Sequence, residues 1–169
     1  MAEYKIQVPK EHYNNSYDNL ERFISYFYQI KSAIDTKSKE ILEIGIGNGT
    51  VSDYLKKTGI KVTTCDFDKE LKPDVVADIR KLPFADKSMD TVLAFEILEH
   101  IPFEDLPKAL KELKRVSRKN VIISVPYSCV SVELASRISC CFISKLISFA
   151  IRIPYFFVGI KMGGRNKEH

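Results

Sequence analysis

Residues 41–50 read ILEIGIGNGT, an apolar strand that runs into a glycine-rich turn, and residues 51–55, VSDYL, continue in a helical pattern. Glycine reaches positive φ and has no Cβ, so Gly45, Gly47 and Gly49 let the chain turn sharply and let a ligand approach the backbone. The free N–H groups at the start of the following helix favour an anionic group there. The stretch therefore predicts a strand, a turn and a helix that together bind a nucleotide-like ligand.

The spacing of the glycines narrows the choice of ligand. A dinucleotide fingerprint reads G-x-G-x-x-G, whereas here the third glycine, Gly49, comes one position early and Thr50 stands in its place. The acid Glu43, close before the first glycine, would repel a pyrophosphate but suits an ammonium group. An amino acid joined to a nucleoside fits both ends, with its carboxylate toward the helix and its ammonium toward Glu43.

Strand and helix patterns alternate along the middle of the chain. Apolar and β-branched runs predict further strands, the last of them fully buried, at residues 61–66, 75–78, 90–96 and 121–125. A helix capped by Asp105 is expected before the last strand. This order predicts an α/β fold, a doubly wound and mostly parallel sheet of about five strands with helices on both faces, and a ligand site at its carboxyl edge.

Several segments resemble the ordered motifs of class I S-adenosylmethionine-dependent methyltransferases. Residues 43–50, EIGIGNGT, resemble the first motif, and residues 78–84, DIRKLPF, resemble the family's D-x-x-x-L-P-F segment. The run 90–102, DTVLAFEILEHIP, is similar to the methyltransferase type 11, or ubiquinone-biosynthesis-like, branch. The resemblance covers residues 39–127. It implies a Rossmann-like core, S-adenosylmethionine as the cofactor, and methyl transfer by direct displacement to a small-molecule or lipophilic metabolite.

The resemblance also implies a cofactor site. Asp66 ends the second strand, where a carboxylate can accept two hydrogen bonds from a ribose diol and where the family carries an acid. The structural alternative for Asp66 is a helix cap for residues 69–71. In the family the acid matching Asp78 accepts from the adenine amino group, and the backbone of the next residue reads a ring nitrogen. The expected cofactor-binding residues are Glu43, Gly45, Gly47, Gly49, Asp66, Phe67, Asp78, Ile79, Phe95 and Glu96.

The sequence does not identify a catalytic residue. Phe95 and Glu96 are expected at the methionine end of the pocket, and His100 is the only histidine inside the matched core. His100 is a candidate general base, although a lone histidine near a helix start is more often a hydrogen-bonding scaffold. A sulfonium methyl is already activated, so positioning and the exclusion of water supply most of the catalysis. No metal is expected, because no Cys-x-x-Cys spacing occurs.

The composition is that of one globular domain. The 169 residues are 45% hydrophobic and 28% charged, values that argue against disorder. The net charge of +4 is mildly basic, but no dense Lys/Arg block is interleaved with aromatic residues, so no nucleic-acid partner is expected. Residues 1–10 contain no apolar core of signal-peptide length, so the expected compartment is the cytoplasm. The oligomeric state is left open.

Within the single domain, residues 1–38 are expected to form an N-terminal helical segment before the core at 39–127. Apolar residues recur at helical spacing and predict an amphipathic helix packed ahead of the first strand, at Leu20, Phe23, Ile24, Phe27, Ile30 and Ile34. Tyr13 and Tyr17 either close over the cofactor, as N-terminal segments do in the resembled family, or serve as packing aromatics.

The last segment, residues 128–169, departs from the family pattern. No sixth or seventh strand is expected, and the run at 130–160 is rich in Val, Ile, Leu, Phe and Ser. Charged residues interrupt this run at Glu133, Arg137, Lys145 and Arg152. They leave no apolar stretch of the about 20 residues that a membrane span needs. The segment is expected to be an apolar helical cover for the substrate pocket in a C-terminally truncated methyltransferase core. The alternative is a basic amphipathic element that makes peripheral membrane contact.

Two other functions remain as alternatives. One is a non-catalytic S-adenosylmethionine-binding or membrane-surface module, that is, a truncated and inactive methyltransferase. The other is a nicotinamide-dependent oxidoreductase, against which the early third glycine, Gly49, and the acid Glu43 both count. Titration with the two classes of cofactor separates the oxidoreductase, and turnover separates an enzyme from a binding module.

Overall fold

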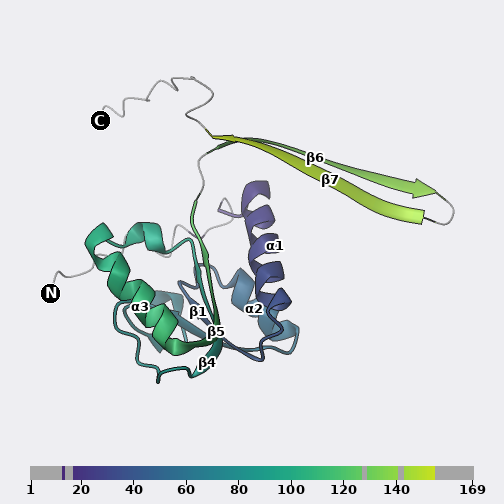
Figure 1. Cartoon of the computed structure of the whole chain (residues 1–169). Coiled ribbons are helices and arrows are strands. Elements are labelled where there is room, and N and C mark those ends of the chain that lie inside the picture. The colour runs from purple at the N-terminus through teal and green to yellow at the C-terminus, as the bar shows by residue number, and fades with distance from the viewer. Residues whose placement is uncertain (1–12, 14–16, 127–128, 141–142, 155–169) are drawn as a thin grey trace, which may run out of the picture. The chain divides into compact units, whose positions relative to one another are not determined.

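The computed structural model describes residues 13, 17–126, 129–140 and 143–154. The chain divides into two compact units, Met1–Val125 and Pro126–His169, whose elements are drawn in Figure 1. The division falls close to the boundary after residue 127 at which the sequence departs from the methyltransferase pattern.

The first unit is built on a five-stranded parallel sheet in the order β3-β2-β1-β4-β5. The strands are β1 Glu40–Ile44, β2 Lys61–Asp66, β3 Val75–Val76, β4 Met89–Phe95 and β5 Ser117–Ser124. Strand β1, which leads into the glycine turn, lies between β2 and β4. The strand order reverses between β1 and β4, and the carboxyl edge at such a switch point is where open α/β sheets bind ligands.

Helices lie on both faces of this sheet (Figure 1). The described helices are α1 Leu20–Asp35, α2 Thr50–Lys57 and α3 Leu106–Val116, with short 3₁₀ turns η2 Lys69–Leu71, η3 Leu98–His100 and η4 Phe103–Asp105. Asn19 caps α1 by accepting a hydrogen bond from the Arg22 N–H at 2.9 Å. The sheet and its two helical layers confirm the predicted doubly wound, Rossmann-like fold.

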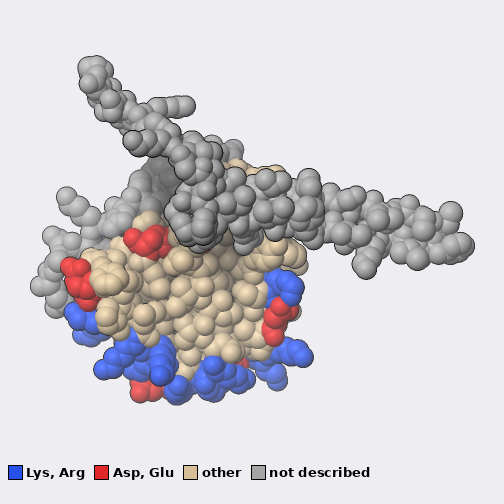
Figure 2. Space-filling model, turned by 45° about the horizontal axis from the view of Figure 1, so that its top comes forward, with Lys and Arg blue, Asp and Glu red and all other residues tan. Residues whose placement is uncertain are grey.

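Asp90, at the start of β4, organises the basic amino-terminal edge of the sheet. Figure 2 shows Lys and Arg side chains along the lower edge of the view. Asp90 Oδ1 forms ion pairs with Arg118 at 2.8 Å and Lys119 at 3.1 Å, and Oδ2 accepts from the Lys39 and Glu40 N–H groups. The bonds from Lys119, Lys39 and Glu40 lower the pKa of Asp90 to about 2. Two of the basic side chains on this edge, Arg118 and Lys119, are therefore paired with one buried carboxylate.

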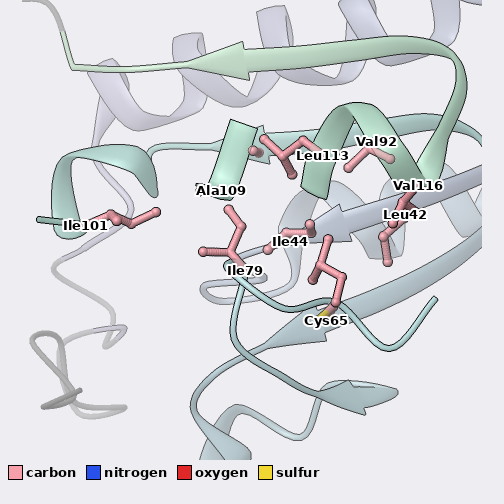
Figure 3. Packing of buried hydrophobic residues seen from close by; sticks show 11 residues of the cluster. Leu42, Ile44, Cys65, Ile79, Val92, Ile101, Ala109, Leu113 and Val116 are labelled. Carbon is pink, nitrogen blue, oxygen red and sulfur yellow. The ribbon is translucent and has the colours of Figure 1, made fainter. Parts of the chain in front are cut away.

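Two hydrophobic clusters hold the sheet between its helices. Alternate residues of β1 face opposite sides, so Leu42 and Ile44 pack toward α3 while Ile41 packs toward α1 and α2. Figure 3 shows the α3 side, where the helix contributes Ala109, Leu113 and Val116. The cluster on the other side contains Tyr26, Ala33, Ile41, Val51, Leu55, Val62, Leu93 and Phe95. Strand β1 thus lies in the core on both faces, which fixes the position of the glycine turn that follows it.

Helix α1 turns a different face inward from the one predicted. Its buried residues are Tyr26, Gln29 and Ala33, whereas the predicted inward residues Leu20 and Phe27 are 76% and 61% exposed. The small side chain of Ala33 is fully buried, and the polar groups of Tyr26 and Gln29 have partners in the fold. Steric fit and hydrogen bonding, rather than the sum of apolar residues, therefore select the inward face.

Strand β5 is not fully buried, contrary to the prediction for residues 121–125. It forms one edge of the five-stranded sheet, and Ile123 and Val125 are 39% and 55% exposed. An edge strand can have an apolar sequence although its side chains are partly exposed. The apolar run therefore predicted the strand but not its burial.

The second unit contains strands, which corrects the helical segment predicted for residues 128–169. Strands β6 Cys129–Cys140 and β7 Ile143–Pro154 pair antiparallel as a hairpin. The reason lies in the alternation of Val130 and Val132 with polar residues, a period of two that suits a strand better than a helix. In the described part of the chain no helix is long and apolar enough to cross a membrane. The roles in pocket cover and membrane contact stay predictions.

Candidate active site

A cavity of about 180 Å³ opens at the carboxyl ends of β1, β2 and β4. The predicted site residues along its wall are Glu43, Gly45, Gly47, Asp66, Phe67, Asp78, Ile79, Phe95, Glu96 and His100. Gly49 is the exception, because it lies at the start of α2 with φ of 79° as the N-cap residue and outside this wall. The structure therefore brings nearly all of the predicted residues together at one edge of the sheet, while their individual roles stay predictions.

The glycine turn leaves space that side chains would fill. Gly45 and Gly47 have φ values of 80° and 53°, a region that residues with a Cβ rarely adopt. A Cβ on Gly45 would lie 3.0 Å from Cδ1 of Ile97, and one on Gly47 would lie 3.5 Å from the ring of Tyr13. The backbone between β1 and α2 is thus open to the cavity at Gly47 and tightly packed at Gly45.

Glu43 is a buried acid without a full set of partners. Its side chain on β1 is 3% exposed, and Oε2 has no hydrogen-bond partner among the described residues. Burial raises the pKa of Glu43 to about 8, since water no longer solvates the charged form. An unsatisfied carboxyl oxygen in a cavity wall is costly unless a ligand supplies the missing donor.

Asp66 accepts backbone hydrogen bonds on both oxygens. The Ile46 N–H in the glycine turn donates to Oδ2 at 2.9 Å, and the Asp68 N–H donates to Oδ1 at 2.8 Å. Burial raises the pKa of Asp66, and these two bonds oppose that shift. The cap of η2 is Asp68, which accepts from the Glu70 N–H. Asp66 is therefore not the helix cap of the structural alternative, and its carboxylate keeps acceptor capacity for a ligand beside these backbone bonds.

Asp78 is held by an arginine that the sequence did not single out. The Arg80 guanidinium donates from Nε to Asp78 Oδ1 and Oδ2 at 3.0 and 2.9 Å, and from Nη1 to Asp105 Oδ2 at 2.6 Å. Burial alone would raise the pKa of Asp78, but the bonds from Arg80 lower it overall. Asp105, the predicted cap of α3, makes no capping bond and pairs with Arg80 and Lys108 instead.

A second network ties the start of α1 to the glycine turn. Asn48 Nδ2 donates to Asp18 Oδ1 at 3.0 Å and to the Tyr26 hydroxyl at 3.0 Å, and that hydroxyl donates to Asp18. Asn48 Oδ1 also accepts from the Thr50 N–H at 3.1 Å. The sequence could point only to Asn48, which lies inside the glycine motif. Its partners Asp18 and Tyr26 are 30 and 22 residues away in the sequence.

Aromatic rings from the N-terminal segment line the same cavity. Tyr13 and Tyr17 pack edge to face with ring centroids 5.0 Å apart, and the Arg22 guanidinium lies 4.5 Å from the centre of the Tyr17 ring. Burial is the main reason that the pKa of Tyr13 is raised to about 12. Both predicted tyrosines thus border the cavity, and they also pack against each other.

Glu96 closes the end of β4 in a rare backbone conformation. Its φ is 53°, its N–H donates to the Ser124 carbonyl at 3.0 Å, and its Oε1 accepts from the Ser124 hydroxyl at 2.8 Å. His100 follows in η3 and lines the cavity. The neighbouring Glu99 has a raised pKa because of burial first and the charge of Glu96 second among the groups that raise it. Acidic groups are therefore concentrated at this end of the site.

Comparison with known proteins places this site in a family. A family model described as "Methyltransferase domain" matches residues 42–125. This chain belongs to the methyltransferase-domain family. The matched region of the methyltransferase domain contains the glycine turn, all five strands in whole or in part, and every predicted site residue.

Two curated relatives extend the comparison. The chain is 31% identical to a demethylmenaquinone methyltransferase of Thermobifida fusca (strain YX) over 124 residues, which cover 60% of this chain and 52% of that protein. It is 31% identical to the demethylmenaquinone methyltransferase of Paenarthrobacter aurescens (strain TC1) over 101 residues, which cover 53% of this chain and 39% of that protein. The chain thus spans about half the length, or less, of these relatives.

Solved structures share the fold of this methyltransferase domain. A putative S-adenosyl-L-methionine-dependent methyltransferase from Methanococcus maripaludis superposes with a TM-score of 0.56 at 18% identity, covering 74% of this chain and 67% of that chain. The PH0226 protein from Pyrococcus horikoshii OT3 gives a TM-score of 0.53 at 22% identity, covering 62% and 58%. At these identities the likeness shows the fold alone.

The cofactor that the family implies is S-adenosylmethionine, and the residues present fit it. The orphaned Oε2 of Glu43 suits an ammonium donor, and the space beside Gly47 that a Cβ would occupy suits a close approach to the backbone. Among the described residues no group of three potential metal ligands comes together. Glu43 and the space at Gly47 thus suit a ligand that has an ammonium group and comes close to the backbone.

Proposed function

We propose that this chain is an S-adenosylmethionine-dependent methyltransferase that transfers a methyl group to a small-molecule acceptor. The observation that carries the proposal is Glu43, a buried carboxyl group whose Oε2 lacks a donor and which faces a cavity beside the glycine turn. An ammonium group would satisfy it, and the amino-acid end of S-adenosylmethionine has one. The family match at residues 42–125 supports the same conclusion.

Each part of the cofactor has a residue of suitable chemistry in the wall. Glu43 is proposed to bind the ammonium group, and the N–H groups at the start of α2 favour the carboxylate. Asp66 is proposed to accept from the ribose diol with the acceptor capacity that its backbone hydrogen bonds leave. Ile79 lines the cavity at the proposed adenine end, where the Asp78 carboxylate is already engaged by Arg80. An adenine amino group would therefore share Asp78 with that guanidinium.

When bound, S-adenosylmethionine supplies an electrophilic methyl group on a sulfonium sulfur that leaves as a neutral thioether. The chain has to hold an acceptor in line with that methyl group and to keep water away. Tyr13 lies beside Gly47, Tyr17 packs against Tyr13, and both border the cavity, where they are proposed to exclude water. The bonds from Asn48 to Asp18 and Tyr26 are proposed to keep the start of α1 beside the turn.

The acceptor is proposed to belong to the reduced quinones, that is, aromatic rings with hydroxyl groups. The relatives that support this class are the demethylmenaquinone methyltransferases, which are 31% identical over their matched regions. The cavity offers aromatic walls at Tyr17, Tyr26 and Phe95 against which such a ring can pack.

Calorimetric titration tests the cofactor assignment. S-adenosylmethionine and S-adenosylhomocysteine are expected to bind, and the nicotinamide dinucleotides are not. Glu43→Ala should weaken binding at least about tenfold, because a hydrogen bond to a charged group is lost. Glu104→Ala, which removes an exposed acid that does not line the cavity, is the control and should bind normally. A folded wild-type protein that binds neither sulfur compound would overturn the proposal.

Transfer of a labelled methyl group separates an enzyme from a binding module. The full chain, labelled S-adenosylmethionine and separate pools of quinols, lipids and small polar metabolites are incubated together. Label is expected in the quinol pool. Binding of the cofactor without transfer to any pool would support the non-catalytic alternative instead.

A further inference from the structure

Glu96 is held in place more firmly than its position at a strand end requires. A residue with a Cβ rarely adopts a φ of 53°, and such conformations persist where the surrounding structure fixes them and often where function needs them. Here the Ser124 carbonyl accepts from the Glu96 N–H at 3.0 Å, which ties the end of β4 to β5. The backbone and the side chain of Glu96 are thus both bonded to the same residue.

In the hydrogen-bond chain that reaches Glu96, each residue donates to the next and Glu96 is the final acceptor. Gln29 on α1 is 6% exposed, and its Nε2 donates to Ser25 Oγ at 3.1 Å and, over a longer distance of 3.4 Å, to Ser124 Oγ. A hydroxyl has one proton to donate, and with Gln29 as a donor the proton of Ser124 is directed to Glu96 Oε1 at 2.8 Å. The chain Gln29, Ser124, Glu96 therefore ends on the carboxylate.

The two carboxylate oxygens of Glu96 differ in their hydrogen-bond partners. Glu96 lines the cavity, and among the described residues Oε2 of Glu96 receives no hydrogen bond from protein. Tyr17 and Phe95 border the same space with aromatic rings. A carboxylate oxygen only accepts, so an uncharged group that meets Oε2 in this space pairs with it through an O–H or N–H donor.

We infer that Oε2 of Glu96 binds the hydroxyl group of an aromatic methyl acceptor, and that Ser124 and Gln29 are positioning residues that orient this carboxylate. The inference rests on the proposed function, since it assigns the acceptor part of the same site. It also separates the two acids of the wall, with Glu43 directed to the cofactor and Glu96 to the acceptor.

In this assignment Glu96 acts as the base for the hydroxyl group of the acceptor. Oε2 of Glu96 takes the hydroxyl proton, and the electron pair of the O–H bond stays on the aromatic oxygen and, by conjugation, on the ring carbon beside it. One of these two atoms forms the new bond to the methyl carbon while the carbon–sulfur bond breaks with its electron pair on sulfur. A ring carbon that has gained the methyl group then loses its own proton to water, which restores the aromatic ring.

The test compares one ring in two oxidation states. The full chain is saturated with S-adenosylhomocysteine and titrated without oxygen with 1,4-naphthohydroquinone, which has two hydroxyl donors, or with 1,4-naphthoquinone, which has none. The hydroquinone should bind at least about tenfold more tightly, the change that a hydrogen bond to a charged group brings. Equal binding of the two rings, or no binding of the hydroquinone, would overturn the inference.

Variants identify the residues that produce the discrimination. Glu96→Gln and Ser124→Ala should each reduce the ratio of the two affinities toward one, while S-adenosylhomocysteine still binds. Ser124→Thr keeps the hydroxyl and should restore the ratio, which a merely structural role would not predict. Ser25→Ala removes the other partner of Gln29 and is the matched control.

The outcomes also separate this inference from the proposed function. Loss of S-adenosylhomocysteine binding in the wild type would overturn the proposed function itself. Intact cofactor binding with an unchanged hydroquinone preference in Glu96→Gln would overturn the inference alone.

Discussion

Glu43 and Asp66 show how the same functional group takes different properties at one sheet edge. Both side chains lie at the carboxyl ends of neighbouring strands and both pKa values are raised by burial. Asp66 has a backbone donor on each oxygen, whereas Oε2 of Glu43 has none among the described residues. Backbone donors therefore offset part of the effect of burial on Asp66, whereas Oε2 of Glu43 has no such donor among the described residues.

Binding of the cofactor should release a proton from Glu43. The pKa of about 8 means that the buried group is largely protonated at pH 7, and an ammonium partner favours the ionised form. Calorimetry at pH 7 in two buffers of different ionisation enthalpy should show release of up to about one proton per S-adenosylmethionine bound. Glu43→Gln should abolish most of this release. Binding by the wild type without any proton exchange would contradict the raised pKa.

The same group should make stability depend on pH. Between about 4.5 and about 8 the folded protein keeps the Glu43 proton that the unfolded chain loses. The unfolded state then binds fewer protons, so this contribution to the free energy of unfolding falls as pH rises through the window and is constant above it. Glu43→Gln should therefore flatten the decline in urea unfolding measured from pH 5.5 to 8.5. An identical decline in both proteins would assign it to other groups.

Gly47 and Gly59 separate backbone strain from ligand contact. Both have positive φ, 53° and 87°, so an alanine at either site should cost about 1 kcal/mol of unfolding free energy. A Cβ at Gly47 points toward the Tyr13 ring in the cavity wall, while one at Gly59 meets nothing within 4 Å. Only Gly47→Ala should weaken S-adenosylhomocysteine binding. Equal loss of affinity in the two variants would mean that the turn is only structural.

The sequence predicted those site residues whose signal is local. Gly45, Gly47 and Glu43 lie in one short motif, and the spacing alone suggested their chemistry. Ser124 and Gln29 escaped prediction because their bond joins positions 95 residues apart, and neither type of residue is unusual in a strand or a helix. Side-chain networks of this kind become visible only when the fold brings distant segments together.

At the scale of elements, periodicity predicted the helices and strands of the first unit better than it predicted their faces. Helix α1 carries apolar residues around most of its circumference, so the apolar stripe through Leu20 and Phe27 was as good a candidate as the true buried face. The prediction for the segment that forms the β6–β7 hairpin was wrong for another reason. The helical prediction relied on the total hydrophobicity of the segment. The alternation of polar and apolar residues, which has the period of a strand, was the better guide.

Two substitutions in α1 test its orientation. Phe27 is 61% exposed and Ala33 is fully buried. Phe27→Ser should change the free energy of unfolding by less than about 0.5 kcal/mol, as surface substitutions do. Ala33→Leu should cost about 1 to 3 kcal/mol, because the added volume has no space against the sheet. Urea titration measures both, and a larger loss at Phe27 than at Ala33 would show that the predicted face is the inward one.

At the scale of the whole molecule, the first unit contains what a cofactor site needs. Both hydrophobic clusters and every described residue of the cavity wall lie before residue 126. A chain of this length can bury a core of its own. The hairpin of β6 and β7 forms its hydrogen-bonded pairs within the second unit. Cofactor binding and cooperative folding are therefore expected to belong to residues 1–126.

Removal of residues 127–169 tests this division. The shortened chain should unfold in one cooperative transition and bind S-adenosylhomocysteine within a factor of about two of the full chain, a difference under about 0.5 kcal/mol. Circular dichroism in urea and calorimetry provide the two measurements. The exposed side chains Ile123 and Val125 on and beside β5 favour association, so the sedimentation coefficient is followed over a range of concentrations as a control. Loss of cofactor binding in a folded, monomeric shortened chain would mean that the second unit completes the cofactor site, because no wall residue of the first unit has been removed.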